Sequence, residues 1–133
     1  METTKKIIIY QVFTRLFGNQ NKTCQPDGSI EVNGCGKMKD FTKQALHEIK
    51  KLGATHIWYT GLLAHASQTD YTAYGIPKNH PSIVKGKAGS PYAIRDYYDV
   101  DPDLATSIPD RMKEFENLVT RSHKAGLKVI IDF

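Results

Sequence analysis

Aromatic side chains that carry hydroxyl groups are the residues of this chain best suited to one kind of chemistry, the binding of a sugar ring. Tyr92, Tyr97 and Tyr98 lie in one short stretch, and Trp58 lies earlier in the chain. A sugar ring has an apolar C–H face and polar edges, which an aromatic ring with a hydroxyl can match. These residues would suit a carbohydrate cleft. Packing in the core is the competing interpretation, above all for Trp58 and one residue of the Tyr97–Tyr98 pair.

Five aspartates raise the question of acid/base catalysis: Asp96, Asp99, Asp101, Asp103 and Asp110. Acid/base hydrolysis uses a pair of carboxyl groups, which such a cluster could in principle supply. The context favours structural roles instead, because Asp101-Pro102-Asp103 is typical of a turn and Asp110 lies at a predicted helix start. We therefore expect no catalytic pair in this cluster.

The histidines differ in the positions that they occupy. His47 and His123 fall on helical patterns, where surface or packing roles are the default, and His56 opens a predicted strand. His65 and His80 lie in a long loop, and either could contact a ligand.

Motifs for phosphate, hydrolase and metal sites are missing from the sequence. The nearest approach to a phosphate-binding loop, Gly34-Cys35-Gly36-Lys37, lacks the required spacing. There is no G-x-S-x-G elbow and no H-E-x-x-H pair. Cys24 and Cys35 have no C-x-x-C spacing and no nearby histidine, so they could pair in an exported protein or stay reduced in a cytosolic one. We expect no cofactor and no metal in this chain.

Composition narrows the classes of protein further. The chain has 133 residues, 40% of them hydrophobic, and a net charge of +4, which indicates globular material of about one domain. Its lysines are scattered, so we expect no nucleic acid as a partner. No apolar run approaches the ~18 residues of a spanning helix, so we expect no membrane segment and no uncleaved signal peptide. The polar start favours a cytoplasmic protein, although an exported protein would look similar after removal of its signal peptide.

Strands and helices must alternate to position these side chains. The predicted elements are strands at 7–13, 54–59 and 127–133, helices at 38–52 and 107–125, and loops at 18–37 and 60–106. Continuous apolar strands are typical of parallel sheets. The order predicts an α/β fold with a parallel sheet, either doubly wound or closed as a barrel. In both architectures ligands bind at the carboxyl ends of the strands, which both long loops follow.

Four sequence blocks resemble, in order and spacing, the amino-terminal part of the α-amylase family of glycoside hydrolases. They are IYQVF at 9–13, KDF at 39–41 continued by LGATHIW at 52–58, YAIRDYYDVDP at 92–102, and HKAGLKVIID at 123–132. The resemblance implies a (β/α)₈ TIM barrel that cleaves or transfers α-glucosidic bonds by a retaining mechanism. The chain would then be a partial barrel domain of about three strands and two helices, truncated at the end of the third strand. Starch or maltodextrins would be its substrates.

The resemblance also implies roles for individual residues. Tyr92, in the pattern Y-x-x-x-D-x-Y, resembles the tyrosine that stacks on the sugar beside the scissile bond, with Asp96 and Tyr98 supporting the site. Asp132 resembles the first residue of the D-x-x-x-N-H motif, which is mainly a structural brace. We take His65 as a second candidate for substrate contact.

The catalytic residues of the family are not assigned in this chain. The nucleophilic Asp, the acid/base Glu and the transition-state-stabilising Asp belong to later strands, and the Asn often used for calcium would come after Phe133. Calcium is therefore left open for the parent protein. One local departure is Gly61, which stands where the second strand's motif usually ends in Pro.

Two other interpretations stay open. The chain could belong to a non-catalytic amylase-like protein that binds carbohydrate or serves as a subunit. It could also be a self-contained three-stranded module, which would melt cooperatively on its own, whereas a partial barrel would aggregate or stay molten because its sheet edges are open. The sequence leaves open the linkage and chain length of the substrate, hydrolysis against transfer, and the oligomeric state.

Overall fold

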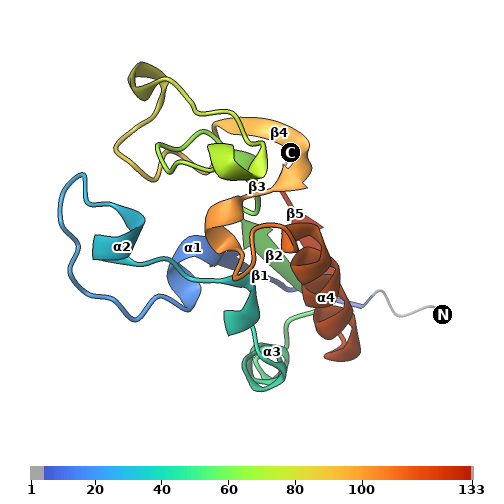
Figure 1. Cartoon of the computed structure of the whole chain (residues 1–133). Helices are drawn as coiled ribbons and strands as arrows, with labels where there is room; N and C mark the ends of the chain where they lie inside the picture. Colours follow the sequence, from blue (N-terminus) through green and yellow to red (C-terminus); the bar gives the residue numbers. More distant parts are fainter. Residues whose placement is uncertain (1–4, 133) are drawn as a thin grey trace.

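The centre of the fold is a parallel sheet of three strands. The computed structural model describes residues 5–132, and its sheet has the order β1 (Ile9–Phe13), β2 (His56–Thr60) and β5 (Lys128–Ile131). Figure 1 shows these strands side by side in the middle of the molecule. The α/β fold and the parallel sheet are confirmed. The predicted end of the third strand at Phe133 lies outside the described residues.

Two helices cover the same face of this sheet (Figure 1). The helix α3 (Lys43–Lys51) connects β1 to β2, and α4 (Arg111–Lys124) connects β2 to β5. Two successive right-handed crossovers between neighbouring strands place their helices on one side. A (β/α) barrel repeats this arrangement, whereas a doubly wound sheet has helices on both faces.

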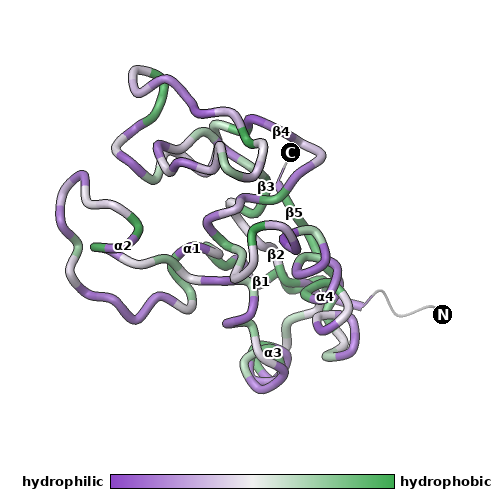
Figure 2. Tube along the Cα trace, in the orientation of Figure 1, coloured by the Kyte–Doolittle hydropathy of each residue, from purple (hydrophilic) through white to green (hydrophobic). Residues whose placement is uncertain are grey.

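The core lies between the sheet and the two helices. Strand residues at alternate positions meet the buried faces of α3 and α4 in one cluster, which includes Val12, Ile57, Tyr59, Leu46, Ile49 and Leu118. The buried Tyr59 hydroxyl lies 2.7 Å from Ser122 Oγ, which itself donates to the carbonyl of Leu118. Figure 2 shows a hydrophobic stretch at β5 in the middle of the molecule, whereas much of the outer loops is hydrophilic.

The helix predicted at 38–52 is divided in the structure. A short 3₁₀ turn, η1 (Met38–Asp40), comes first, and α3 begins only at Lys43. Thr42 separates them, because its side chain accepts a hydrogen bond from the backbone N–H of Ala45 and so caps α3. A helix in this region is confirmed, but the prediction that it runs unbroken from 38 to 52 was wrong.

The second predicted helix begins later than expected. Its first residue is Arg111, and the Ser107 side chain donates to Asp110 and does not cap the helix backbone. The carboxylate of Glu114 accepts the backbone N–H groups of Thr106 and Ser107 in its place. Glu114, in the first turn of α4, therefore fixes the segment that leads into the helix.

The loops hold more regular structure than their composition indicated. Within 60–106, β3 (Leu63–His65) and β4 (Ile94–Val100) form an antiparallel pair with shifted register. The remaining short elements are α1 (Thr14–Phe17), α2 (Ile30–Asn33), η2 (Thr72–Tyr74), η3 (Pro81–Ile83) and η4 (Pro102–Leu104). Within residues 5–132 no helix has the length and apolar character needed to span a bilayer.

Candidate functional site

Residues of β1 and β2 meet the segment that carries Tyr92 at the carboxyl ends of these strands. A cavity of ≈ 310 Å³ opens there, and it is lined by Gln11, Phe13, Thr60, Pro91 and Tyr92. The side chain of Gln11 donates to the hydroxyl of Thr60, which ties β1 to β2 at the cavity wall. The carboxyl ends of the strands are where α/β folds bind ligands.

Tyr92 places an aromatic ring at this cavity. The residue is 68% exposed, so its ring is available to a ligand. Its backbone is held in place, because the N–H of Tyr92 donates to the side chain of Ser90 and the N–H of Ala66 donates to the carbonyl of Ala93. The prediction that Tyr92 binds substrate stays a prediction, made at a residue that the fold leaves accessible.

Asp96 and Tyr98 both lie on β4, after Tyr92. A carboxylate oxygen of Asp96 accepts the backbone N–H of Tyr98 at 2.8 Å. Tyr98 is 93% exposed. A hydrogen bond thus connects these two residues. That they support the sugar site stays a prediction.

Asp132 connects β5 to the end of β2. One carboxylate oxygen accepts the indole N–H of Trp58 at 2.6 Å, and the other accepts the backbone N–H of Gly61 at 2.8 Å. Asp132 is buried, so both donors depend on it inside the protein. The contacts are those of a structural brace.

The backbone geometry at position 61 explains why a glycine stands there. Gly61 has a φ of 74°, and a Cβ at this position would come within 2.8 Å of the side chain of Pro91. Proline fixes φ near −65° and has no N–H to offer Asp132. Where proline is usual, this chain therefore has a glycine whose backbone N–H donates to the carboxylate of Asp132.

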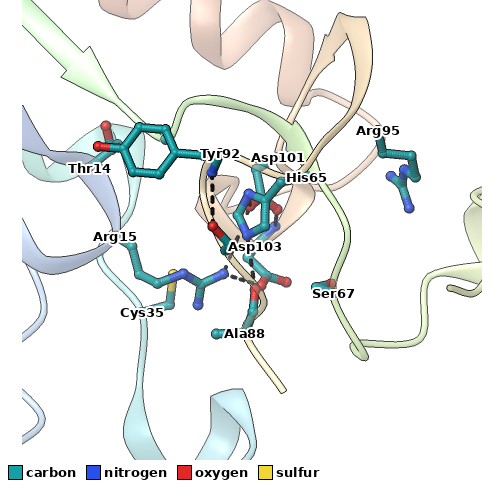
Figure 3. A network of polar contacts seen from close by, with 12 residues as sticks. Thr14, Arg15, Cys35, His65, Ser67, Ala88, Tyr92, Arg95, Asp101 and Asp103 are labelled. Atoms are coloured by element: carbon teal, nitrogen blue, oxygen red, sulfur yellow. Dashed lines mark hydrogen bonds and ion pairs between the residues drawn. The ribbon is translucent and has the colours of Figure 1, made fainter. Parts of the chain in front are cut away.

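A buried polar network is centred on Asp101 and Asp103, and Figure 3 shows its central residues. The guanidinium of Arg15 pairs with Asp103 and lies 3.9 Å from Asp101. A second oxygen of Asp101 accepts the backbone N–H of Asp103. The hydroxyl of Tyr71 also donates to Asp103. Both aspartates are at most 1% exposed, and Arg15 supplies positive charge beside them. One oxygen of Asp101 and Nδ1 of His65 are buried without a hydrogen-bond partner among the described residues.

His65 belongs to this network and not to the open surface. It is 3% exposed, its Nδ1 lies 2.8 Å from Asp101, and its Nε2 lies 2.9 Å from the carbonyl of Ala88. Burial lowers the pKa of His65, but the bond to Asp101, the charge of Asp101 and the Ala88 carbonyl together outweigh it and raise the pKa above 6.5. The prediction that His65 contacts substrate stays a prediction, and here both ring nitrogens face protein atoms.

The other aspartates of the cluster have protein partners as well. Asp99 accepts two hydrogen bonds from the guanidinium of Arg111, at 2.8 and 2.9 Å. Asp110 accepts the hydroxyl of Ser107. Asp110 directly precedes α4, as predicted for a residue at a helix start, but its side chain makes no hydrogen bond to the helix backbone.

A second hollow, of ≈ 400 Å³, lies between the 19–34 loop and the segments around Gln68 and Ala88. Cys24 is on its lining, and both cysteines are free thiols. Burial raises the pKa of Cys35 to about 11, so this thiol is protonated at neutral pH. Among the described residues, no group of three or more His, Cys, Asp or Glu side chains is arranged to hold a metal ion.

Sequence reasoning missed the network around Arg15. Its members Arg15, His65 and Asp101 lie far apart in the chain, and no spacing rule connects them. The hint in the sequence was the cluster of aspartates just before η4, since buried carboxylates need a cation.

Comparison with known proteins identifies the family. The family model of the α-amylase catalytic domain matches residues 11–133. A cyclomaltodextrin glucanotransferase of Bacillus licheniformis is 29% identical over 136 residues, which cover 95% of this chain and 17% of that protein. Over 42 residues, 32% of the chain, the amino acid transporter heavy chain SLC3A1 of Rattus norvegicus is 50% identical.

Solved structures agree with the sequence matches. The maltogenic α-amylase AmyB of Thermotoga neapolitana has a TM-score of 0.58 and 26% identity, covering 96% of this chain and 22% of its own. The trehalose-6-phosphate hydrolase of Bacillus licheniformis has a TM-score of 0.54 and 25% identity, covering 97% of this chain and 17% of its own. The chain thus spans less than a quarter of the length of these relatives. The match over residues 11–133 shows that the chain belongs to the α-amylase family.

Proposed function

We propose that this chain forms the amino-terminal part of a (β/α)₈ barrel that acts on α-linked glucans such as starch and maltodextrins. Two observations support the barrel: α3 and α4 cover one face of a parallel sheet, and relatives several times longer match 95–96% of the chain. The names of the relatives, a cyclomaltodextrin glucanotransferase and a maltogenic α-amylase among them, support the substrate class.

The exposed ring of Tyr92 at the carboxyl edge of the sheet is the observation that carries this proposal. The ring lines a cavity together with Gln11 and Thr60, whose side chains are polar, and with Phe13 and Pro91, which are apolar. A sugar needs both kinds of surface, since its ring faces are apolar and its edges carry hydroxyls. Tyr92 would stack on the sugar unit beside the bond that is cleaved.

We further propose that the parent protein uses a retaining mechanism, with catalytic carboxylates outside this chain. A retaining glycosidase needs two carboxyl groups ~5 Å apart on either side of the scissile bond. Asp101 and Asp103 are buried and paired with Arg15, and Asp132 braces β2, so these carboxylates are committed to the fold. The role of this chain is then to bind and orient the glucan.

Replacing Tyr92 tests the proposal. In the full-length protein, Tyr92→Ala should lower kcat/KM on maltodextrins by the equivalent of about 1–3 kcal/mol, the range for loss of a well-placed aromatic contact. Tyr92→Phe keeps the ring face and should retain most of the activity. Tyr74→Ala is the matched control, because Tyr74 is also exposed but does not line the cavity. An unchanged kcat/KM in Tyr92→Ala would exclude the stacking role.

A second candidate function is favoured by the SLC3A1 match. An amylase-like chain that serves as a subunit or binds carbohydrate without cleaving it would share this fold and this cavity, and the transporter heavy chain is 50% identical over 42 residues. Calorimetry and product analysis on the same maltodextrin separate the two functions. Binding without release of reducing ends supports the non-catalytic protein, and release of reducing ends supports the enzyme.

A further inference from the structure

Both ring nitrogens of His65 face oxygen atoms, and this limits where its protons are. Nε2 lies 2.9 Å from the carbonyl of Ala88, and a carbonyl can only accept, so Nε2 carries a hydrogen. Nδ1 lies 2.8 Å from a carboxylate oxygen of Asp101, at ion-pair distance but without hydrogen-bond geometry, and a lone pair on Nδ1 would face the charge of this carboxylate. A neutral histidine with an ionised Asp101 has one proton too few for the two contacts.

We propose that His65 is a positioning residue for Tyr92, and that the second proton on its ring holds the segment that carries Tyr92 in its place for glucan binding. The part of this inference that concerns glucan binding rests on the proposed function, whereas the part that concerns the contacts of His65 does not. His65 links Asp101, at the start of η4, to Ala88, four residues before Tyr92.

The segment from 86 to 93 lies along the residues that follow β3. The backbone N–H of Gln68 donates to the carbonyl of Lys87, and that of Ala66 donates to the carbonyl of Ala93. His65 adds a side-chain bond between these two contacts, at Ala88. The position of the Tyr92 ring therefore depends on a segment whose middle is fastened by His65.

His65 belongs to a network of charged and titratable groups from several elements. They are Asp101 at the start of η4, Asp103 within it, Arg15 of α1, Tyr71 before η2, and Lys37 and Cys35 before η1. Asp101 favours the charged imidazolium, whereas the charge of Arg15 opposes it. Arg15 is itself paired with Asp103, so Asp101 remains the dominant partner of the ring.

Loss of the second proton releases Ala88 and not Asp101. The pKa of His65 is raised above 6.5 in the folded protein, so the imidazolium contributes stability below that pH, and the contribution is lost as pH rises through the folded pKa. The remaining proton stays on Nδ1, because a lone pair at this nitrogen would face the charge of the Asp101 carboxylate, which repels it more strongly than the Ala88 carbonyl repels a lone pair on Nε2. Nε2 then turns a lone pair toward the carbonyl of Ala88, and the segment loosens.

The Asp101→Asn variant can keep the contact with His65 without a second proton on the His65 ring. The amide of the variant can donate to the lone pair of a neutral His65 at Nδ1, while Nε2–H still donates to Ala88. The second carboxylate oxygen, which accepts the N–H of Asp103, is kept as the amide oxygen. The variant should therefore hold the segment at neutral and alkaline pH without a titrating proton.

Hydrogen exchange in the full-length protein tests the structural part without any substrate. After correction for intrinsic exchange, protection of residues 86–93 in the wild type should fall about tenfold between pH 6 and pH 9, as expected for one charge-assisted hydrogen bond. Between pH 7 and pH 9, protection in Asp101→Asn should stay constant. His47→Gln, at an exposed position on α3, should follow the wild type.

Maltodextrin kinetics on the same proteins test the link to binding. Between pH 7 and pH 9, KM of the wild type should rise severalfold relative to KM of Asp101→Asn, while the ratio of their kcat values stays constant. Wild-type protection that does not change with pH overturns the proposal, and so does protection in Asp101→Asn that falls as in the wild type. The wild-type series needs no variant to fold. If the protein does not act on maltodextrins, these kinetics cannot be measured, but the hydrogen-exchange result still tests the structural part.

Discussion

A single carboxylate, that of Asp132, holds two donors from different parts of the chain. Trp58 comes from within β2 and Gly61 from just after it, so the brace fixes both the strand and the turn that leads toward β3. The carboxylate of Asp132 thereby fixes β2 and the turn next to Thr60, which lines the cavity.

Asp132→Ala should destabilise the full-length protein by about 2–4 kcal/mol, because it leaves two donors without an acceptor. Trp58→Phe removes only one donor and should cost less. Urea unfolding followed by circular dichroism measures both variants. Equal stability of Asp132→Ala and the wild type would show that the brace contributes nothing.

Single residues could be predicted from the sequence where a local motif surrounds them, and not where their partners lie far away in the chain. Tyr92 and Asp132 could be singled out because a motif surrounds each of them. The burial of His65 could not be predicted, because its partners Asp101 and Ala88 reach it only through the pairing of β3 with β4. That pairing has shifted register, which leaves no alternation in the sequence to detect.

At the scale of elements, the close approach of the 86–93 segment to the end of β3 decides where Tyr92 lies. Gly89 makes this approach possible: it has a φ of 76°, and a Cβ there would come within 1.8 Å of the carbonyl oxygen of Ala66. Gly75 has the same φ of 76°, but a Cβ at that position would point into open space. The two glycines thus differ in their surroundings but not in φ.

Gly89→Ala should therefore cost more than Gly75→Ala. Both variants incur the backbone strain of a left-handed residue, roughly 1–2 kcal/mol. Only Gly89→Ala must also move the segment that carries Tyr92, so it should raise KM for maltodextrins as well as lower the melting temperature. Thermal melts and kinetics on the full-length protein measure this difference. The idea fails if the two variants behave alike.

Helix and strand positions of the α/β unit could be predicted from apolar spacing, since α3, α4 and the three parallel strands each bury a regular face. The boundaries could not, because Thr42 and Glu114 end and begin segments through side-chain bonds to the backbone. The long segment between β2 and α4 lacked periodicity because short 3₁₀ turns and an irregular strand pair replace regular structure there.

At the scale of the whole molecule, the sheet has a covered face and an open one. Alternate residues of β1 and β2 that do not meet α3 and α4, such as Gln11, Phe13 and Trp58, lie on the open face. In the proposed barrel this face would be turned inward, with the cavity at Tyr92 opening at its carboxyl end. The arrangement of the sheet would thus place Tyr92 at the carboxyl end of the proposed barrel.

The stereochemistry of cleavage by the full-length protein tests the central claim most directly. Proton NMR during the first minutes of maltodextrin cleavage shows which anomer of the new reducing end is released before mutarotation. Retention of configuration predicts the α-anomer first, with the signal lost or strongly slowed in Tyr92→Ala. Release of the β-anomer first, or no cleavage and no binding of the glucan, would contradict the account.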